Sequence, residues 1–184
     1  MGKWFGLGFL PKAPGTWGSG FPLAVVLGCG HFRCNPFMLC ITLLLLLIAS
    51  SIATIATFDW YSNHFGTPDP GAVVSDEVAG QSLALLGMAW LAPDSQVSTP
   101  TWIGLAVLAF MLFRVFDIWK CGPIGKVQQM QRGNGVLLDD ILAGAVAGLI
   151  SAYFGGYVDH VIQRIVDVMM SIPTILLALT VIAS

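Results

Sequence analysis

Long apolar stretches alternate with short polar ones along most of the chain. The clearest apolar stretch runs without a charged residue from Phe37 to Phe58, which is enough for one helical crossing, since a crossing takes about 20 residues. Each shorter stretch predicts either a further crossing or a short, tilted or partly buried helix. These stretches are Phe21–Cys29, Ala79–Ala92, Thr101–Phe113, Ile141–Val158 and Met169–Ala183.

The polar residues gather in three islands, which run from Lys3 to Ser19, from Asp59 to Gln81 and from Arg114 to Asp140. We expect five crossings, at residues roughly 19–30, 37–58, 79–92, 101–116 and 141–158. All three islands then lie on one side of the membrane, together with six Lys and Arg residues, whereas the loops that join these crossings on the other side carry only Arg33. Because positive charge favours cytoplasmic loops, the pattern predicts an all-α polytopic membrane bundle with its islands in the cytoplasm.

Composition supports a bilayer as the solvent of this chain. Its 184 residues are 56% hydrophobic and 10% charged, whereas soluble domains carry about 25% charged residues. The mean hydropathy is +0.81. These values exclude an ordinary soluble enzyme, a disordered protein and a small disulfide-rich module, and the net charge of −2 argues against nucleic acid as a partner.

Acidic residues stand where two of the predicted helices begin. Asp76 and Glu77 precede the apolar stretch from Ala79, and Asp139 and Asp140 precede the stretch from Ile141. Taken one by one, such acids are explained as helix caps, because a carboxylate in a first turn faces the positive end of the helix dipole.

Two glycines indicate that these acidic helix ends meet. Asp76 precedes Gly80 by four residues and Asp140 precedes Gly144 by four, so each acid shares a helix face with a glycine. Glycine allows another membrane helix to approach closely. Ionisable groups at such a contact are a hypothesis for a functional site.

Converging carboxylates repel one another unless a cation compensates their charge. Carboxylate oxygens suit Mg²⁺, which also keeps waters and binds substrate phosphates. The sequence therefore predicts Mg²⁺ as cofactor. Its predicted ligands are Asp76, Glu77, Asp139 and Asp140.

A third helix end carries basic residues suited to a phosphate. Asp117 lies three residues from both Arg114 and Lys120, and we expect the two cations to hold the phosphate. Three roles stay open for Asp117: a further metal ligand, a base that activates water, or a nucleophile that forms an aspartyl phosphate.

The segment Pro14–Ser19 predicts a glycine-bearing turn that enters a helix, with hydroxyls and backbone N–H groups of the kind that bind anions. A plain turn with a Ser or Thr cap is the simpler explanation of the same residues. Lys12, Thr16 and Ser19 are the weaker candidates for phosphate contacts.

Five motifs, in order, resemble the phosphatidylglycerophosphatase A family over about residues 6 to 150. They are Ala13–Ser19, Asp69–Gln81, Phe113–Lys120, Gly133–Val136 and Asp139–Gly144. The resemblance implies an all-α, Mg²⁺-dependent lipid phosphatase of the bacterial inner (cytoplasmic) membrane. Such an enzyme removes the terminal phosphate of phosphatidylglycerophosphate to give phosphatidylglycerol. Two positions depart from the family pattern: Cys121 replaces a proline, and Asn134 replaces a glycine.

The end of the chain follows another pattern. We expect a phosphatase-like membrane domain over residues 1–150 and an atypical helical tail over residues 151–184. From Tyr153 on, the sequence resembles the coupling-loop segment of a peptide-type ABC transporter permease, without the rest of such a permease. A non-catalytic transport subunit is therefore the rival hypothesis. An acid-lined channel is disfavoured, because the acids lie at helix ends.

Overall fold

The computed structural model describes residues 13–31, 35–67, 70–91, 99–119 and 134–153. These residues form five helices and, among them, no strand. Four helices are α1 (Pro14–His31), α2 (Pro36–Phe65), α3 (Ser75–Leu91) and α4 (Thr99–Trp119). The last one, which we call the fifth helix, is Asn134–Tyr153. The expectation of an all-α bundle is confirmed.

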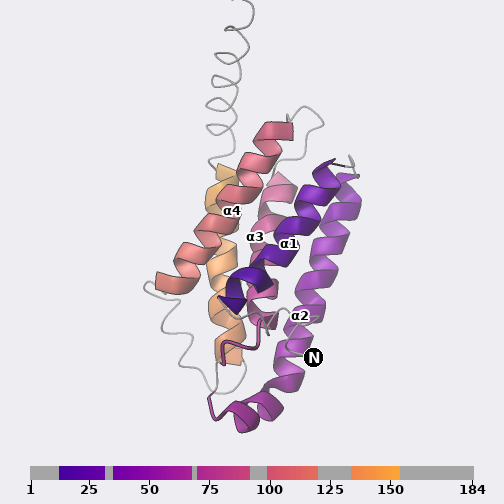
Figure 1. The fold of residues 1–184 in the computed structure, drawn as a ribbon. Helices are drawn as coiled ribbons and strands as arrows, with labels where there is room; N and C mark the ends of the chain where they lie inside the picture. Colours follow the sequence, from indigo (N-terminus) through magenta and orange to yellow (C-terminus); the bar gives the residue numbers. More distant parts are fainter. Residues whose placement is uncertain (1–12, 32–34, 68–69, 92–98, 120–133, 154–184) are drawn as a thin grey trace, which may run out of the picture.

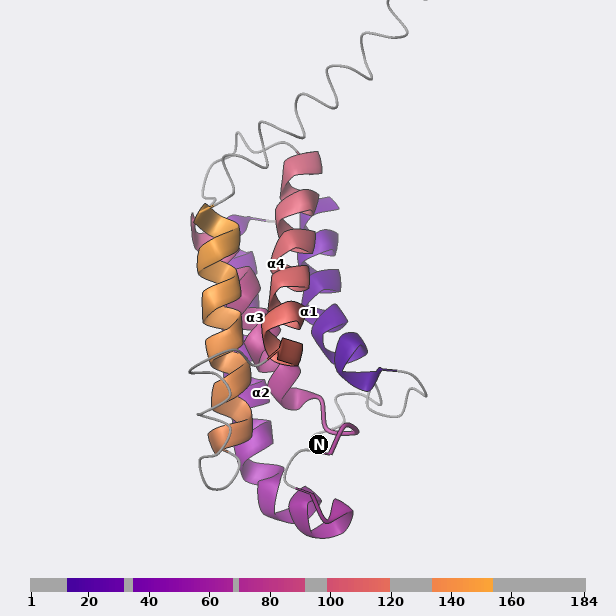
Figure 2. The same cartoon turned by 90° about the vertical axis from the view of Figure 1, so that its left-hand side faces the viewer.

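The helices run up and down in turn along the bundle. In Figure 1, α1, α3 and the fifth helix run upward, whereas α2 and α4 run downward, and Figure 2 shows the same order from the side. As a result, the described parts of the three polar islands lie toward the lower end. We call this end, which carries Asp76, Asp117 and Asp140, the acidic end.

Clear start and stop signals bound α2. The Oδ1 atom of Asn35 accepts a hydrogen bond of 2.9 Å from the N–H of Phe37, and Pro36 occupies the first helical position, where no N–H is needed. At the other end, Gly66 adopts a left-handed φ of 69° and its N–H donates to the carbonyl of Ser62 at 2.9 Å. The 30 residues of α2 span about 45 Å, which exceeds a hydrocarbon core of about 30 Å.

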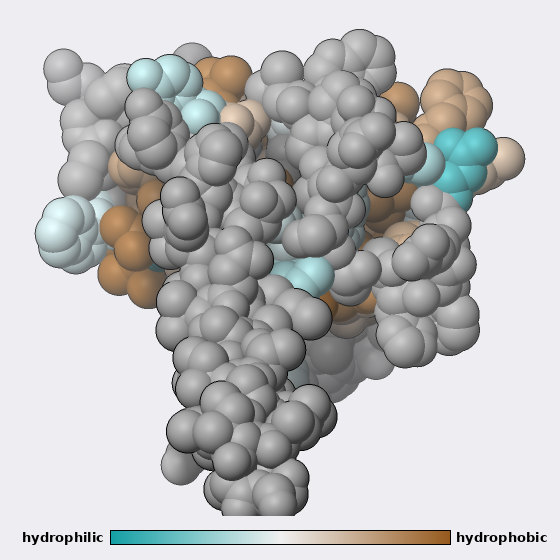
Figure 3. Space-filling view, turned by 90° about the horizontal axis from the view of Figure 1, so that it is seen from above, coloured by the Kyte–Doolittle hydropathy of each residue, from teal (hydrophilic) through white to brown (hydrophobic). Residues whose placement is uncertain are grey.

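Three of the described helices are long and apolar enough to cross a membrane: Pro36–Phe65, Pro100–Trp119 and Asn134–Tyr153. The two others, α1 and α3, have 18 and 17 residues and pack among them. The bundle also presents large apolar side chains outward, such as Ile52 at 61% exposure and Leu149 at 65%. Seen from above in Figure 3, apolar side chains of the described residues reach the surface on several sides. The chain is therefore a membrane-spanning protein.

In the half of the bundle away from the acidic end, apolar side chains pack between the helices. One cluster of buried residues joins α1, α2, α3 and α4, and we call it the apolar core. It consists of Val26, Leu39, Leu43, Leu85, Ala89, Leu105, Ala106 and Ala109. A smaller buried cluster, nearer the acidic end, joins Phe113 of α4 to alanines of α3 and the fifth helix.

The start of α1 differs from the expectation. Pro14–Ser19 is not a turn that enters a helix, because the helix itself begins at Pro14. Glycine weakens a helix by about 1 kcal/mol relative to alanine, but here close packing offsets that cost. A Cβ atom at Gly18 would lie 2.8 Å from the Cβ of Val74, so α1 lies directly against the segment that leads into α3.

The fifth helix also begins earlier than expected. It starts at Asn134, so Asp139 and Asp140 lie in its second turn and do not open it. Burial explains the earlier start. Val136 and Leu137 are only 6% and 5% exposed, and their packing extends the helix toward its N-terminus. The explanation of these two acids as first-turn caps is therefore wrong.

Candidate active site

A contact between α3 and the fifth helix brings the acidic residues together. A Cβ atom at Gly144 would overlap the carbonyl oxygen of Gly80. A Cβ atom at Gly80 would in turn lie 2.5 Å from the carbonyl oxygen of Asp140 and 2.6 Å from Cε2 of Phe113. The two helices thus meet backbone to backbone. Asp76 precedes Gly80 by one helical turn, as Asp140 precedes Gly144, so both acids lie beside this contact.

Buried carboxylates gather around Asp140. Asp76, Asp139 and Asp140 are only 4%, 2% and 4% exposed. The carboxylate of Asp140 interacts electrostatically with those of Asp76, Glu77, Asp117 and Asp139. Three helices, α3, α4 and the fifth helix, thus contribute acids to one region, and burial strengthens the repulsion among their charges.

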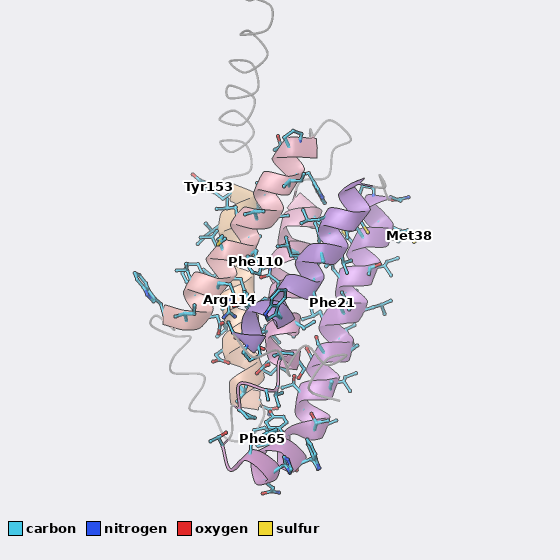
Figure 4. The ribbon with its side chains drawn as sticks, in the orientation of Figure 1. Phe21, Met38, Phe65, Phe110, Arg114 and Tyr153 are labelled. Atoms are coloured by element: carbon cyan, nitrogen blue, oxygen red, sulfur yellow. The ribbon has the colours of Figure 1, made fainter. Side chains whose placement is uncertain are left out.

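Arg114 brings positive charge to this region from α4. Its Nη1 atom donates to Oδ2 of Asp117 at 2.6 Å, and the two side chains are 18% and 15% exposed. Both Arg114 and Glu77 also lie against Gly15 at the start of α1. A Cβ atom there would overlap Oε1 of Glu77 and lie 3.5 Å from Nη1 of Arg114. Figure 4 shows Arg114 beside the first turns of α1, so this glycine makes room for a carboxylate and a guanidinium.

The remaining candidate residues are placed differently. Ser19 is fully buried and its hydroxyl donates to the carbonyl of Gly15 at 2.6 Å, whereas Thr16 is exposed. Lys12 and Lys120 lie outside the described residues. Their contacts with a phosphate stay predictions.

The start of α3 is tied to α2 by a hydrogen bond between side chains. The hydroxyl of Thr54 donates to Oγ of Ser75 at 2.8 Å, and both residues are fully buried. Within α3, Oδ1 of Asp76 accepts from the N–H of Glu77 at 3.1 Å. These bonds hold the first turn of α3, and with it two of the acids, against its neighbours.

The donor set suits Mg²⁺ by its chemistry and its charge. Buried carboxylate oxygens are ligands that this ion prefers, and a dication offsets the repulsion among the acids. Within the described ranges, no three His, Cys, Asp or Glu side chains already surround one point as ligands. Mg²⁺ is commonly held by only one or two carboxylates, with waters and substrate phosphate completing its shell, so the residues present fit it.

Three exposed tryptophans lie near the candidate site. Trp17, Trp60 and Trp119 are 55%, 58% and 75% exposed, and each lies on a different helix toward the acidic end. Trp17 follows Gly15 by two residues, and Trp119 follows Asp117 by two. Tryptophan is enriched where a membrane meets water, and these three lie at the same end of the bundle as the acids.

Two residues of this region were not singled out by the sequence. Gly15 belongs to the segment predicted to form a turn, although its neighbours in space are Glu77 and Arg114. Gln81 is the last residue of the second polar island in the sequence, although its amide is fully buried in the structure. Its spacing of four residues from Glu77 is the signal that could have found it.

The fold and the site define a helical membrane protein with buried acids and an arginine at one end of the bundle. The model of the family described as phosphatidylglycerophosphatase A matches residues 1–154. The chain belongs to the phosphatidylglycerophosphatase A family, and it is a lipid phosphatase that acts on membrane phospholipid.

Three relatives match over most of their length. A Bacteroides thetaiotaomicron protein, whose name assigns it provisionally to the phosphatidylinositol-3-phosphatases, is 34% identical over 83% of this chain and 89% of its own. The phosphatidylglycerophosphatase A of Haemophilus influenzae is 33% identical over 79% and 81%. That of Escherichia coli is 29% identical over 82% and 79%.

The likeness to a permease is partial. The dipeptide transport system permease protein DppC of Alkalihalophilus pseudofirmus is 37% identical over 36% of this chain and 22% of its own length. Residues 154–184, which hold most of the predicted tail, lie outside the described residues. No solved structure matches the chain.

Proposed function

We propose that this enzyme hydrolyses phosphatidylglycerophosphate to phosphatidylglycerol and inorganic phosphate, with Mg²⁺ as cofactor and at the cytoplasmic face of the bacterial inner membrane. Family membership supports the reaction, since two relatives carry the name phosphatidylglycerophosphatase A. The observation that carries the proposal is the gathering of five carboxylates and Arg114 at the acidic end.

In this reaction the bond between the terminal phosphorus and the headgroup oxygen breaks. The oxygen of a water molecule joins the phosphorus, and the leaving headgroup oxygen takes up a proton. A phosphate carries its charge on oxygens that accept hydrogen bonds, and Arg114 offers several N–H donors in a planar fork. Asp117 accepts one of these bonds and so fixes the direction in which the guanidinium points.

Asp76, Glu77, Asp139 and Asp140 are the residues that would hold Mg²⁺. When bound, the ion supplies positive charge that polarises the phosphate and stabilises the charge that develops during its transfer. Burial of Asp76, Asp139 and Asp140 keeps bulk water away from these carboxylates, which strengthens their interaction with a cation. Without a cation the same burial costs free energy.

The distribution of charge supports the cytoplasmic orientation. Six Lys and Arg residues of the three islands belong to the acidic end of the expected topology, against Arg33 at the other end and Arg164 in the tail beyond the fifth expected crossing. Positively charged loops stay in the cytoplasm. The exposed tryptophans support a site at headgroup depth, where a lipid phosphate resides without leaving the bilayer.

Phosphate release from a defined lipid tests the proposal. Protein purified in detergent is given phosphatidylglycerophosphate with Mg²⁺ or with EDTA, and inorganic phosphate is measured. We expect release with Mg²⁺ and none with EDTA, with recovery when excess Mg²⁺ is restored. Equal release in EDTA would contradict the metal requirement, and no release under either condition by folded protein would favour the transport-subunit hypothesis.

A second lipid belongs in the same assay. The name of the Bacteroides thetaiotaomicron relative refers to phosphatidylinositol 3-phosphate, which also carries a phosphate monoester on a polyol headgroup. A higher kcat/KM for phosphatidylinositol 3-phosphate would assign the chain to that substrate instead.

A further inference from the structure

Gln81 has an unusual environment for an amide. Its side chain is fully buried, and neither its Oε1 nor its Nε2 atom has a hydrogen-bond partner among the described residues. Buried polar groups in proteins nearly always have a partner, and an amide without one costs stability because it has lost its water. Such a group points to a ligand that supplies the missing bonds.

The position of Gln81 on α3 connects it with the acids. It follows Glu77 by four residues and precedes Leu85 by four, so the three side chains lie along one face of the helix. Glu77 lies against Gly15 of α1 and near Arg114 of α4, and Leu85 belongs to the apolar core, with residues of α1, α2 and α4. From this spacing we place Gln81 between Glu77 and the apolar core, one turn farther from the acidic end than Glu77.

The direction of the side chain also favours the site. Side chains on a helix lean toward its N-terminus, and α3 begins at the acidic end. The amide of Gln81 thus leans from the membrane side toward Glu77. This direction would bring the amide next to the region in which the acids and Arg114 gather.

An amide offers two donors and an acceptor, which limits the group that satisfies it. A phosphate only accepts hydrogen bonds, so it would leave Oε1 unpaired. A hydroxyl accepts one bond and donates another, and it therefore matches both ends of the amide. In phosphatidylglycerophosphate a free hydroxyl stands on the glycerol between the two phosphates, next to the phosphate that is removed.

We infer that Gln81 is a specificity-determining residue that binds the free hydroxyl of the headgroup glycerol. The inference rests on the proposed function, and it adds the part of the substrate that the acids and Arg114 do not bind. The order of groups is consistent: the terminal phosphate lies at the level of Glu77, and the glycerol lies one turn farther into the membrane.

The first turns of α1 are the element that would yield to admit the headgroup. Pro22 stands inside α1 and has no N–H to donate to the preceding turn, which weakens the helix at that point. The segment before Pro22 is also the one that lies against Glu77 and Val74. An outward movement of this segment is the route by which we expect a headgroup to reach Gln81.

The test compares two lipids and two proteins. One lipid is phosphatidylglycerophosphate, and the other carries its terminal phosphate on propane-1,3-diol, which lacks the hydroxyl. For the unmodified enzyme we expect kcat/KM to fall by at least about tenfold on the deoxy lipid, because the amide is then left unpaired. Gln81→Met keeps the size but removes both polar atoms, so we expect it to treat the two lipids alike within about threefold.

Ser82→Ala is the matched control. Ser82 is equally buried in the next position of α3, but its hydroxyl donates to the carbonyl of Val78 at 2.6 Å within the same helix. We expect this variant to keep the preference for the hydroxylated lipid. Equal use of both lipids by the unmodified enzyme would overturn the inference, and so would an unchanged preference in Gln81→Met.

Lipid binding in EDTA separates this inference from the proposed function. The affinities of the unmodified protein for the two lipids are measured without turnover, so the contact is tested even if no phosphate is released. Activity with equal affinities and rates for both lipids leaves the phosphatase standing and removes Gln81 from the site. Preferential binding of the hydroxylated lipid without any phosphate release does the reverse. Because these arms use the unmodified chain, equal affinities for the two lipids overturn the inference even if Gln81→Met fails to fold.

Discussion

Away from the acidic end, α1, α2, α3 and α4 meet through leucine, valine and alanine side chains of the apolar core. Near the acidic end, α3 and the fifth helix meet through the backbones of Gly80 and Gly144. Side chains of the first kind adjust to small changes of volume. A backbone contact has no such freedom, and it fixes the distance between the two acid-bearing helices.

The two regions also differ in charge. The apolar core holds no ionisable side chain, whereas carboxylates from three helices surround Asp140. Burying like charges together destabilises a fold, and enzymes accept that cost where the charges serve a reaction. The comparison teaches that packing in the apolar half stabilises the bundle, whereas the glycine contact fixes the positions of the two acid-bearing helices relative to each other.

Removal of one acidic charge should have the largest effect. Asp140→Asn, like Asp76→Asn, is expected to lower phosphate release at least about a hundredfold, because the group no longer binds or stabilises charge at the reacting phosphate. We expect the melting temperature in detergent not to fall, since one of several repelling carboxylates becomes neutral. Asp59→Asn, at an exposed position of α2, is the control and should keep activity. Full activity in both site variants would remove these acids from the site.

A methyl group at the glycine contact should come next. Gly144→Ala places a Cβ atom on the carbonyl of Gly80, and we expect it to cost about 1–3 kcal/mol of stability through overpacking, with a loss of activity. The matched variant is Gly28→Ala in α1, because a Cβ atom there meets nothing within 4 Å. It should be neutral or stabilising by up to about 1 kcal/mol. Similar unfolding curves for the two variants would contradict the close contact.

Replacement of Arg114 by lysine tests whether the planar shape of the guanidinium matters beyond its positive charge. Arg114→Lys keeps the positive charge but loses the planar fork, and we expect kcat/KM to fall about 10- to 100-fold. Asp117→Asn then distinguishes the open roles of Asp117. A fall in kcat/KM no larger than that of Arg114→Lys identifies a residue that orients the guanidinium, whereas complete loss of turnover identifies a metal ligand, a nucleophile or a base.

The smallest effect is expected between α2 and α3. Thr54→Val keeps the shape of the side chain but removes its hydrogen bond to Ser75, which should cost about 0.5–1.5 kcal/mol of stability. Thr42→Val is the control, because Thr42 is exposed and its hydroxyl bonds to Met38 within α2. An equal effect of both substitutions in thermal unfolding would show that the bond between the helices contributes nothing.

Much of this arrangement could be predicted from the sequence. The alternation of apolar and polar stretches predicted helices that run up and down, with the islands at one end. Gly80 and Gly144, each four residues after an acid, predicted the close approach of α3 and the fifth helix. Both features depend on periodicity and residue size, which can be read locally.

The helix starts could not be predicted in the same way. Gly15 and Gly135 favour turns by their intrinsic propensity, and only packing against other helices makes the surrounding residues helical. The partners of Gly15 are Glu77 and Arg114, which are far away in the sequence. The environment of Gln81 depends in the same way on three helices at once, so its buried amide is visible only in the folded chain.

The position of the acids at one end of the bundle has a consequence for how the products of the proposed reaction separate. Inorganic phosphate is freely soluble in water and would leave at the acidic end, beside the exposed tryptophans. The dephosphorylated lipid stays anchored by its acyl chains and diffuses sideways within the leaflet. Because one product would leave into the water and the other within the membrane, neither product would obstruct the release of the other.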